Sequence, residues 1–169
     1  MKFKLKNSLV CLLAGCLIAG VLTGCAKDAS TDDYSQTVVA TYGDEKIYLD
    51  EARFFAKLTQ YSYEASFGAG QEFWEYNLTG SGTMESSVKT DVMKKILQTR
   101  ILCDQAEKDG VTLSEDDKKK VTEKVDQFMK DEEIVEITGA TRELLERLYT
   151  ENALANRQRE KMIANWIQT

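Results

Sequence analysis

Histidine and proline are both absent from this sequence of 169 residues, and each absence narrows what the protein can be. Without histidine the chain cannot form a Ser-His-Asp or Cys-His catalytic site, or a zinc site with histidine ligands. Without proline, no residue blocks the backbone hydrogen bonds of a helix. The sequence also has no glycine-rich phosphate-binding loop. These absences favour a mostly helical protein without the common triad or nucleotide-binding chemistry.

Cysteine is scarce, and three of the four cysteines lie close to the start of the chain. Cys11 and Cys16 belong to an apolar leader and Cys25 ends it, which leaves only Cys103 in the remainder. No internal disulfide can therefore form once the leader is removed. Cys103 has apolar neighbours on a predicted helix, so we interpret it as a small buried side chain, with a reactive thiol as the alternative.

The charge is unevenly distributed along the chain. The formal net charge is -6, but residues 2–6 hold the only charges among the first 25, three lysines, so the rest carries about -9. An acidic surface repels a phosphate backbone, and we expect no nucleic-acid partner. The acidic runs at 32–33, 115–117 and 131–133 lack the ligand spacing of a calcium loop. We expect them to be solvated or to begin helices, with no metal bound.

The first 25 residues have the order of a secretory signal. A basic start is followed by an apolar run at 8–22, which is shorter than the roughly 20 residues that span a bilayer as a helix. The run ends in Leu22-Thr23-Gly24-Cys25, which matches the bacterial lipobox, whose cysteine receives a diacylglycerol. We expect a signal peptide at 1–24, a lipidated Cys25 on a flexible tether at 25–37, and one domain at 38–169. An ordinary cleaved signal or an uncleaved anchor is the alternative.

The domain begins with a predicted β-hairpin and continues with helices. Two short apolar stretches within residues 38–49 flank Gly43-Asp44-Glu45, which is typical of a hairpin. Asp50, Ser114 and Thr141 are predicted helix N-caps. Apolar residues at helical spacing then predict four helices, at about 50–67, 84–109, 115–130 and 142–167.

Two connectors and an unusual last helix complete this prediction. Residues 68–83, with four glycines, predict a loop with at most one short helical turn, and residues 131–140 predict a connector. The last helix has a polar middle at 152–159 between apolar rows. We expect this helix to project from the body or to bridge to another part. Its expected apolar rows are Leu145, Leu148, Tyr149, Met162, Ile163 and Trp166.

The order of these elements and two sequence segments resemble a known family. The segments are 39–52, which contains Val-Ala-Thr-Tyr-Gly-Asp-Glu-Lys-Ile and Asp-Glu-Ala, and 101–116, which contains Asp-Gly-Val-Thr-Leu-Ser-Glu-Asp. They resemble the N-terminal chaperone region of the SurA/PrsA-type parvulin foldases over about residues 38–167. The lipobox fits the lipid-anchored, PrsA-like branch of Gram-positive bacteria. The resemblance implies a mainly α, SurA N-terminal-like domain with a short β-hairpin.

The resemblance also implies a function. Members of this family assist the folding of exported proteins, and many carry a parvulin isomerase domain with a histidine cluster. No such centre can be placed here, so we expect no catalytic residues in this chain, although the family is one of peptidyl-prolyl isomerases. We expect a membrane-anchored, extracytoplasmic module that binds unfolded or extended secreted polypeptides, with no cofactor besides the diacylglycerol on Cys25. Candidate client-binding residues are Phe54, Phe55, Tyr61, Phe73 and Trp74, each with core packing as its alternative.

Two other functions remain open at this point. The chain could be the N-terminal part of a PrsA-like prolyl isomerase, or a structural envelope lipoprotein that docks one partner through its last helix. The sequence does not decide whether the chain forms a homodimer, which clients it binds, or whether the residue at 169 is the natural end.

Overall fold

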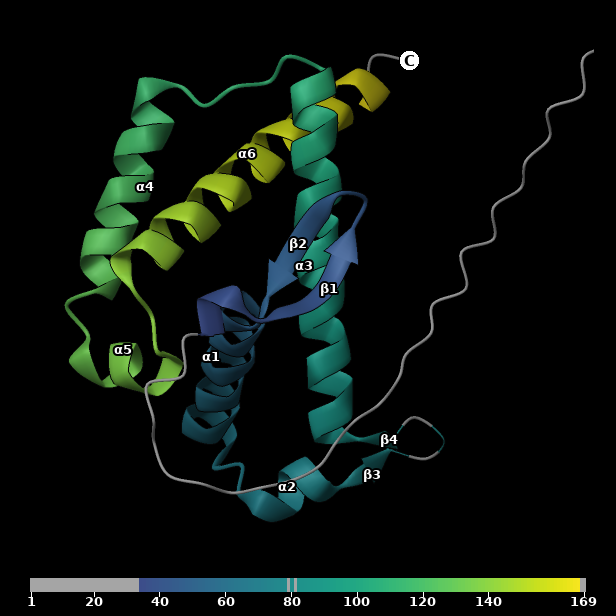
Figure 1. The fold of residues 1–169 in the computed structure, drawn as a ribbon, viewed down its shortest axis with the longest axis vertical. Helices are drawn as coiled ribbons and strands as arrows, with labels where there is room; N and C mark the ends of the chain where they lie inside the picture. The colour runs from purple at the N-terminus through teal and green to yellow at the C-terminus, as the bar shows by residue number, and fades with distance from the viewer. Residues whose placement is uncertain (1–33, 79, 81, 168–169) are drawn as a thin grey trace, which may run out of the picture. The chain divides into compact units, whose positions relative to one another are not determined.

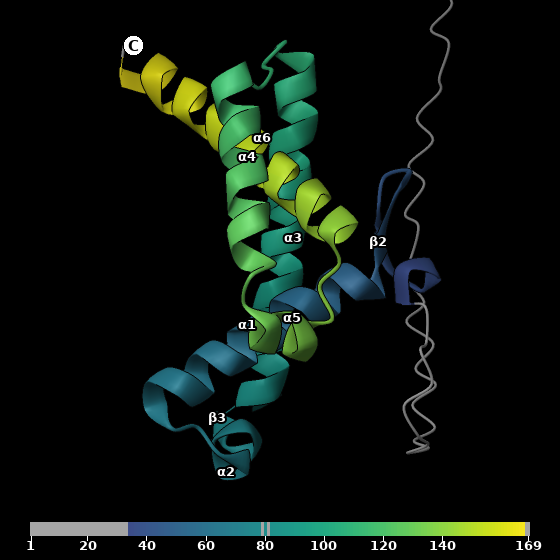
Figure 2. The ribbon, with the colours of Figure 1, turned by 90° about the vertical axis from the view of Figure 1, so that its left-hand side faces the viewer.

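The computed structural model describes residues 34–78, 80 and 82–167, and this part is mainly helical, as predicted (Figures 1 and 2). The signal peptide, Cys25 and the first part of the predicted tether lie outside the described residues. The elements are η1 (Tyr34–Gln36), β1 (Val38–Tyr42), β2 (Glu45–Tyr48), α1 (Leu49–Phe67), α2 (Gln71–Glu75), β3 (Asn77–Leu78), β4 (Gly82–Thr83), α3 (Met84–Lys108), α4 (Glu115–Phe128), α5 (Glu132–Thr138) and α6 (Arg142–Ile167).

The predicted hairpin is confirmed. β1 and β2 pair antiparallel around a turn at Gly43, whose φ of 58° is a conformation that favours glycine. Ile47 on β2 is fully buried and packs on α3. The last residues of the predicted tether belong to the domain, because η1 packs on α1 and the Leu49 amide donates to the Thr37 carbonyl at 2.7 Å.

Most predicted helix ends are confirmed by their hydrogen bonds. Ser114 and Asp117 form a reciprocal capping box at the start of α4, and the Thr141 hydroxyl accepts from the Leu144 amide at 3.1 Å. Gly110 follows α3 with a φ of 65°. The residues next to each of these helix ends were therefore enough to predict where the helix begins or ends.

Three local predictions are wrong. Asp50 lies inside the first turn of α1, because the helix begins at Leu49 and its N-cap, Tyr48, makes no side-chain cap bond. The predicted connector at 131–140 contains α5, whose N-cap Asp131 accepts from the Ile134 amide at 3.2 Å. The predicted loop at 68–83 contains the expected helical turn, α2, but also the strands β3 and β4. Elements this short have too few residues to show a helical or alternating pattern.

Two apolar clusters form the core and meet at α1. The first joins α1, α4 and α6; its buried members are Phe54, Val125, Ala140, Leu144, Leu145 and Leu148. The second joins β2 and α3; its buried members are Ile47, Val92 and Ile96. Phe55 packs against both clusters and links them. Each large side chain buried in this way contributes about 1.5–3 kcal/mol to stability.

The last helix packs as its sequence predicts at its start, where Leu145 and Leu148 are buried, but not in its middle or at its end. α6 crosses α3 diagonally and also packs on α4 (Figure 1). The polar middle holds Ala155 and Gln158, which are 2% and 0% exposed because α6 packs on α3 and α4. The Gln158 side-chain amide donates to Asp109, just after α3, at 2.7 Å. The apolar row predicted at the end of the helix is exposed; it consists of Met162, Ile163 and Trp166.

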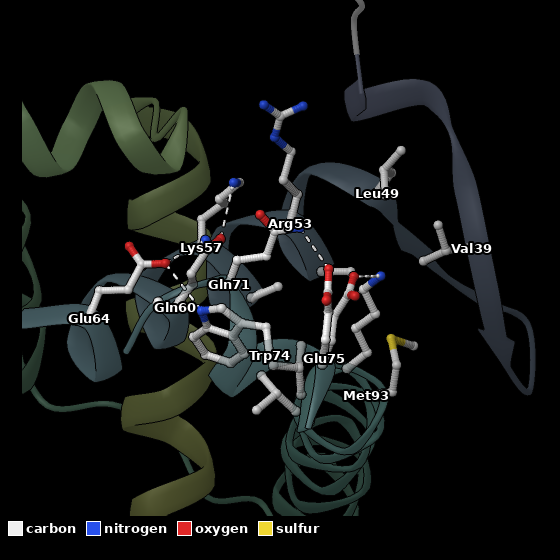
Figure 3. A pocket seen from close by; sticks show the side chains of 17 residues that line it. Val39, Leu49, Arg53, Lys57, Gln60, Glu64, Gln71, Trp74, Glu75 and Met93 are labelled. Atoms are coloured by element: carbon white, nitrogen blue, oxygen red, sulfur yellow. Dashed lines mark hydrogen bonds and ion pairs between the residues drawn. The ribbon is translucent and has the colours of Figure 1, made fainter. Parts of the chain in front are cut away.

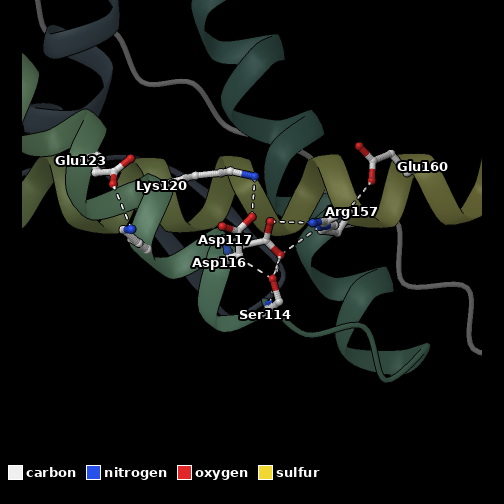
Figure 4. A network of polar contacts seen from close by, with 8 residues as sticks. Ser114, Asp116, Asp117, Lys120, Glu123, Arg157 and Glu160 are labelled. Atoms are coloured by element: carbon white, nitrogen blue, oxygen red, sulfur yellow. Dashed lines mark hydrogen bonds and ion pairs between the residues drawn. The ribbon is translucent and has the colours of Figure 1, made fainter.

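A polar network joins the start of α4 to α6 and predicts a pH effect (Figure 4). Hydrogen bonds from Arg157 and Ser114 hold the pKa of Asp117 well below its usual value. Arg157 donates to both carboxylate oxygens, at 2.7 and 3.0 Å. A lowered folded-state pKa means that the stabilisation is present above the unfolded pKa of about 3.9 and is lost as the pH falls below it.

Replacing Asp117 with asparagine is therefore expected to lower stability at neutral pH and to flatten its acid dependence. The measurement is urea denaturation of the wild type and the variant between about pH 6 and pH 2. Asp116→Asn is the matched control, because Asp116 pairs only with the exposed Lys120 among the described residues. Equal flattening in the two variants would contradict the role assigned to Asp117.

Candidate functional site

A cleft of about 880 Å³ lies between α1, α2 and α3, with the hairpin at one end (Figure 3). Ala52 and Ala56 lie one turn apart on α1, so this side of the helix adds little bulk to the cleft. α3 supplies larger apolar groups opposite them. The apolar lining consists of Val39, Leu49, Ala52, Ala56, Val88, Val92 and Met93. An apolar floor is therefore open to a ligand.

Polar side chains surround this floor. Along α1 they follow one another at a spacing of three or four residues: Arg53, Lys57, Gln60 and Glu64. Glu64 is held in place, because it accepts from Trp74 Nε1 at 3.2 Å and from Gln60 Nε2 at 2.8 Å. Across the cleft, Glu75 accepts from Gln71 at 2.7 Å and Glu85 pairs with Lys89 at 2.5 Å. The rim is thus mixed in charge.

An aromatic cluster closes one end of the cleft. The rings of Phe73 and Trp74 meet edge to face at 5.0 Å, and Tyr63 lies 5.6 Å from Phe73 and 5.8 Å from Trp74. Such pairs add about 0.5–1.5 kcal/mol each beyond their buried area. Together with the bond to Glu64, they fix the indole of Trp74 at the wall of the cleft.

Only one of the five predicted client-binding residues lines this cleft. Trp74 does; Phe73 supports it, and Tyr61 is half-buried elsewhere on α1. Phe54 is only 1% exposed, so its assignment to a binding groove is wrong. Phe55 is partly buried and packs against both core clusters, which favours its alternative of core packing. The prediction failed because adjacent aromatic residues on a helix point in directions that depend on how the helix docks.

Sequence reasoning missed the small residues that open the cleft. Ala52 and Ala56 form a short row of small side chains at helical spacing, which is a weak signal by itself. Val88 and Met93 of α3 pack against the second core cluster and also line the cleft. A cleft between two helices becomes visible only when their docking is known.

A second polar cluster is buried where β2, α1, α3 and α6 meet. The Arg100 side chain is 7% exposed and contacts three carboxylates, with Glu51 at 2.8 Å, Glu45 at 3.4 Å and Glu151 in direct contact. Arg147 also pairs with Glu51, at 3.0 Å. Burial alone lowers the pKa of Arg100, but the attraction of these carboxylates outweighs burial and raises it. Every charge in this cluster is paired, so we interpret it as structural.

Cys103 behaves as an unreactive side chain. Its thiol is half-buried and donates to the Glu151 carbonyl at 3.3 Å. Burial, followed by the charge of Glu151, raises the pKa of Cys103 to about 11. A thiol with this pKa is almost fully protonated at neutral pH, and the nucleophilic form is the thiolate. This favours the interpretation of Cys103 as a packing residue.

The described part contains no group of three or more acidic, cysteine or histidine side chains arranged to hold a metal ion. None of its helices has both the length and the apolar character needed to cross a bilayer.

In comparisons with known proteins, the chain matches no family model, no curated protein and no solved structure. The interpretation of the cleft therefore depends on its own geometry and on the sequence features described above.

Proposed function

We propose that this protein is a lipid-anchored, extracytoplasmic chaperone-like module whose cleft holds extended apolar segments of exported polypeptides. The observation that carries this proposal is the cleft of about 880 Å³ with an apolar floor and a polar rim. Its volume falls within the roughly 300–1,000 Å³ of typical ligand sites. The lipobox at Cys25 and the resemblance to the SurA/PrsA-type foldases support the location and the class of ligand.

The lining suits a ligand that varies in sequence. Met93 offers a flexible, polarisable side chain that adapts to different apolar groups. Trp74, fixed by Glu64, provides a rigid aromatic wall. Such a surface gives weak and promiscuous binding, which is what a protein needs to hold many clients and release them.

In this proposal the chain binds and does no chemistry of its own, since its sequence has no histidine with which to form a parvulin-like centre. If the chain is the N-terminal part of a PrsA-like isomerase, the same cleft would hold the polypeptide for a catalytic centre elsewhere. Both versions require the cleft to bind peptide.

Filling the cleft tests the proposal. Ala56→Trp adds an indole to the floor, and we expect it to weaken binding of a fluorescein-labelled peptide, with apolar residues at alternate positions, by about tenfold or more. The measurement is fluorescence anisotropy with the full chain in detergent. Ala65→Trp is the matched control, because Ala65 is an exposed residue of the same helix that does not line the cleft. Equal binding by wild type and Ala56→Trp, or none by the wild type, would refute the proposal.

One observation favours the alternative of a docking lipoprotein. The end of α6 exposes four apolar side chains, Met162, Ile163, Trp166 and Ile167, which are 50–79% exposed. A photo-crosslinker placed at Lys161 distinguishes the two functions in intact cells. Reproducible capture of one fixed partner at stoichiometric yield would favour docking, whereas diffuse capture would leave the cleft as the working site.

A further inference from the structure

We propose that the cleft is selective for apolar segments that carry a carboxylate, which Arg53 and Lys57 receive on the α1 side. This inference rests on the proposed function and names the class of polypeptide segment that the cleft prefers. It begins from the state of the three cations that line the cleft, Arg53, Lys57 and Lys89.

These three cations are not equivalent. Lys89 is neutralised by Glu85 at 2.5 Å. Arg53 lies over the Tyr34 ring at 4.5 Å, and Lys57 donates to the amide oxygen of Gln60 at 3.1 Å. Neither contact supplies a negative charge, and within residues 34–167 neither cation has a carboxylate at ion-pair distance. Among the described residues, two positive charges on the α1 rim therefore have no carboxylate partner.

The carboxylates of the rim already accept hydrogen bonds, although only Glu85 is paired with a cation. Glu64 accepts from Gln60 and Trp74, Glu75 accepts from Gln71, and Glu85 holds Lys89. The cations without a carboxylate partner among the described residues thus lie on the second and third turns of α1, whereas each rim carboxylate already accepts a hydrogen bond. A ligand carboxylate would pair with a cation that has no carboxylate partner among the described residues, whereas a ligand cation would share a carboxylate that already accepts a hydrogen bond.

The spacing of the two cations fits one carboxylate beside an apolar group. Arg53 and Lys57 are four residues apart, so their side chains begin about 6 Å from each other on one face of α1. Ala52 and Ala56 precede them along the helix and belong to the apolar floor. A polypeptide that places an apolar side chain on this floor therefore brings the next residue to the basic rim. The guanidinium of Arg53 can bind a carboxylate through two parallel hydrogen bonds.

The acidic charge of the rest of the chain opposes this local preference. The chain after residue 25 carries a net charge of about -9, so acidic clients are repelled by most of its surface. A local basic pair is needed if such clients are to be held at all. At the rim of an open cleft the preference should be modest, about fivefold in Kd, because exposed ion pairs are partly screened by water.

Three labelled peptides with one apolar core, flanked by glutamate, glutamine or lysine, test the inference by fluorescence anisotropy with the full chain. We expect the glutamate peptide to bind about fivefold tighter than the glutamine peptide, and the lysine peptide to bind most weakly. The preference should shrink at about 1 M salt, where the screening length falls to roughly 3 Å. The double variant Arg53→Gln, Lys57→Gln should bind all three peptides alike.

The control is Lys124→Gln, which removes an exposed cation of α4 that also lacks an ion pair among the described residues and lies outside the cleft. It should keep the full preference. Glutamine preserves helix propensity at these positions, and circular dichroism checks that each variant is folded. Equal affinity for the three peptides, or a preference that survives in the double variant, overturns the inference and leaves the proposed function standing. Failure of all three peptides to bind overturns both.

Discussion

Replacing Arg100 with methionine is expected to destabilise the domain by about 3–5 kcal/mol, the range found when one partner of a buried ion pair is removed. Arg100 is the central cation of a cluster that holds Glu45, Glu51 and Glu151. Glu51 is 2% exposed, so water cannot replace the lost guanidinium. Arg147 remains at 3.0 Å from Glu51 but compensates only part of the negative charge.

The loss should also depend on pH. Burial already raises the pKa of Glu151, and Arg100 opposes that rise, so removing Arg100 raises the pKa further. A carboxyl whose folded pKa exceeds its unfolded value makes the protein more stable as the pH falls. The deficit of Arg100→Met relative to wild type should therefore be smaller at about pH 5 than at about pH 7.

Urea denaturation at both pH values measures these effects. Lys94→Met is the matched control on the same helix, since Lys94 is 65% exposed and its pair with Asp91 spans 3.3 Å. We expect the control to lose less than about 1 kcal/mol. A triple variant with Arg100→Met, Glu51→Gln and Glu151→Gln should recover part of the loss. A loss below about 1 kcal/mol for Arg100→Met would show that the cluster does not stabilise the fold.

Replacing Phe54 with alanine is the second change with a large expected effect, a loss of about 3–5 kcal/mol. Phe54 is 1% exposed and packs against Phe55 at 5.3 Å and Phe128 at 5.7 Å between ring centroids. The variant loses the transfer free energy of the ring and leaves a cavity where α1 meets α4 and α6, because neighbouring helices relax only in part.

The matched control is Phe67→Ala at the end of the same helix. Phe67 is 75% exposed, and its contact with Tyr63 is peripheral, so we expect a change below about 1 kcal/mol. Thermal and urea unfolding compare the two variants. Similar losses would contradict the assignment of Phe54 to the core, as would a Phe54→Ala protein with normal stability and impaired peptide binding.

The variants of the cleft are expected to change peptide binding without changing the stability of the fold. Ala56→Trp alters the floor, whereas Arg53 and Lys57 are at the rim, and neither set belongs to the buried members of the core clusters. Binding and stability should therefore change independently of one another. This independence is expected of a module in which the helices form a stable frame and the cleft side chains recognise the ligand.

Local chemistry explains why so many elements could be predicted from the sequence. A hairpin turn at Gly43, a capping box at Ser114 and a glycine after α3 each depend on residues within about four positions of one another. The long helices α3 and α6 were predicted because their apolar rows repeat over several turns. α5 was missed although Asp131 and Gly139 mark its ends, because seven residues are too few for a clear repeat.

The sequence by itself determined the mainly helical class, the first hairpin, most helix ends and the acidic charge, because each of these depends on composition or on neighbouring residues. Only the tertiary structure decided which side chains face inward. It buried Phe54, and it covered the polar middle of α6 while leaving Trp166 exposed. It also brought Arg100 to carboxylates 49–55 positions away and left a cleft between α1 and α3. These outcomes depend on the angles at which distant helices dock, which the packing of the whole domain fixes and no local pattern encodes.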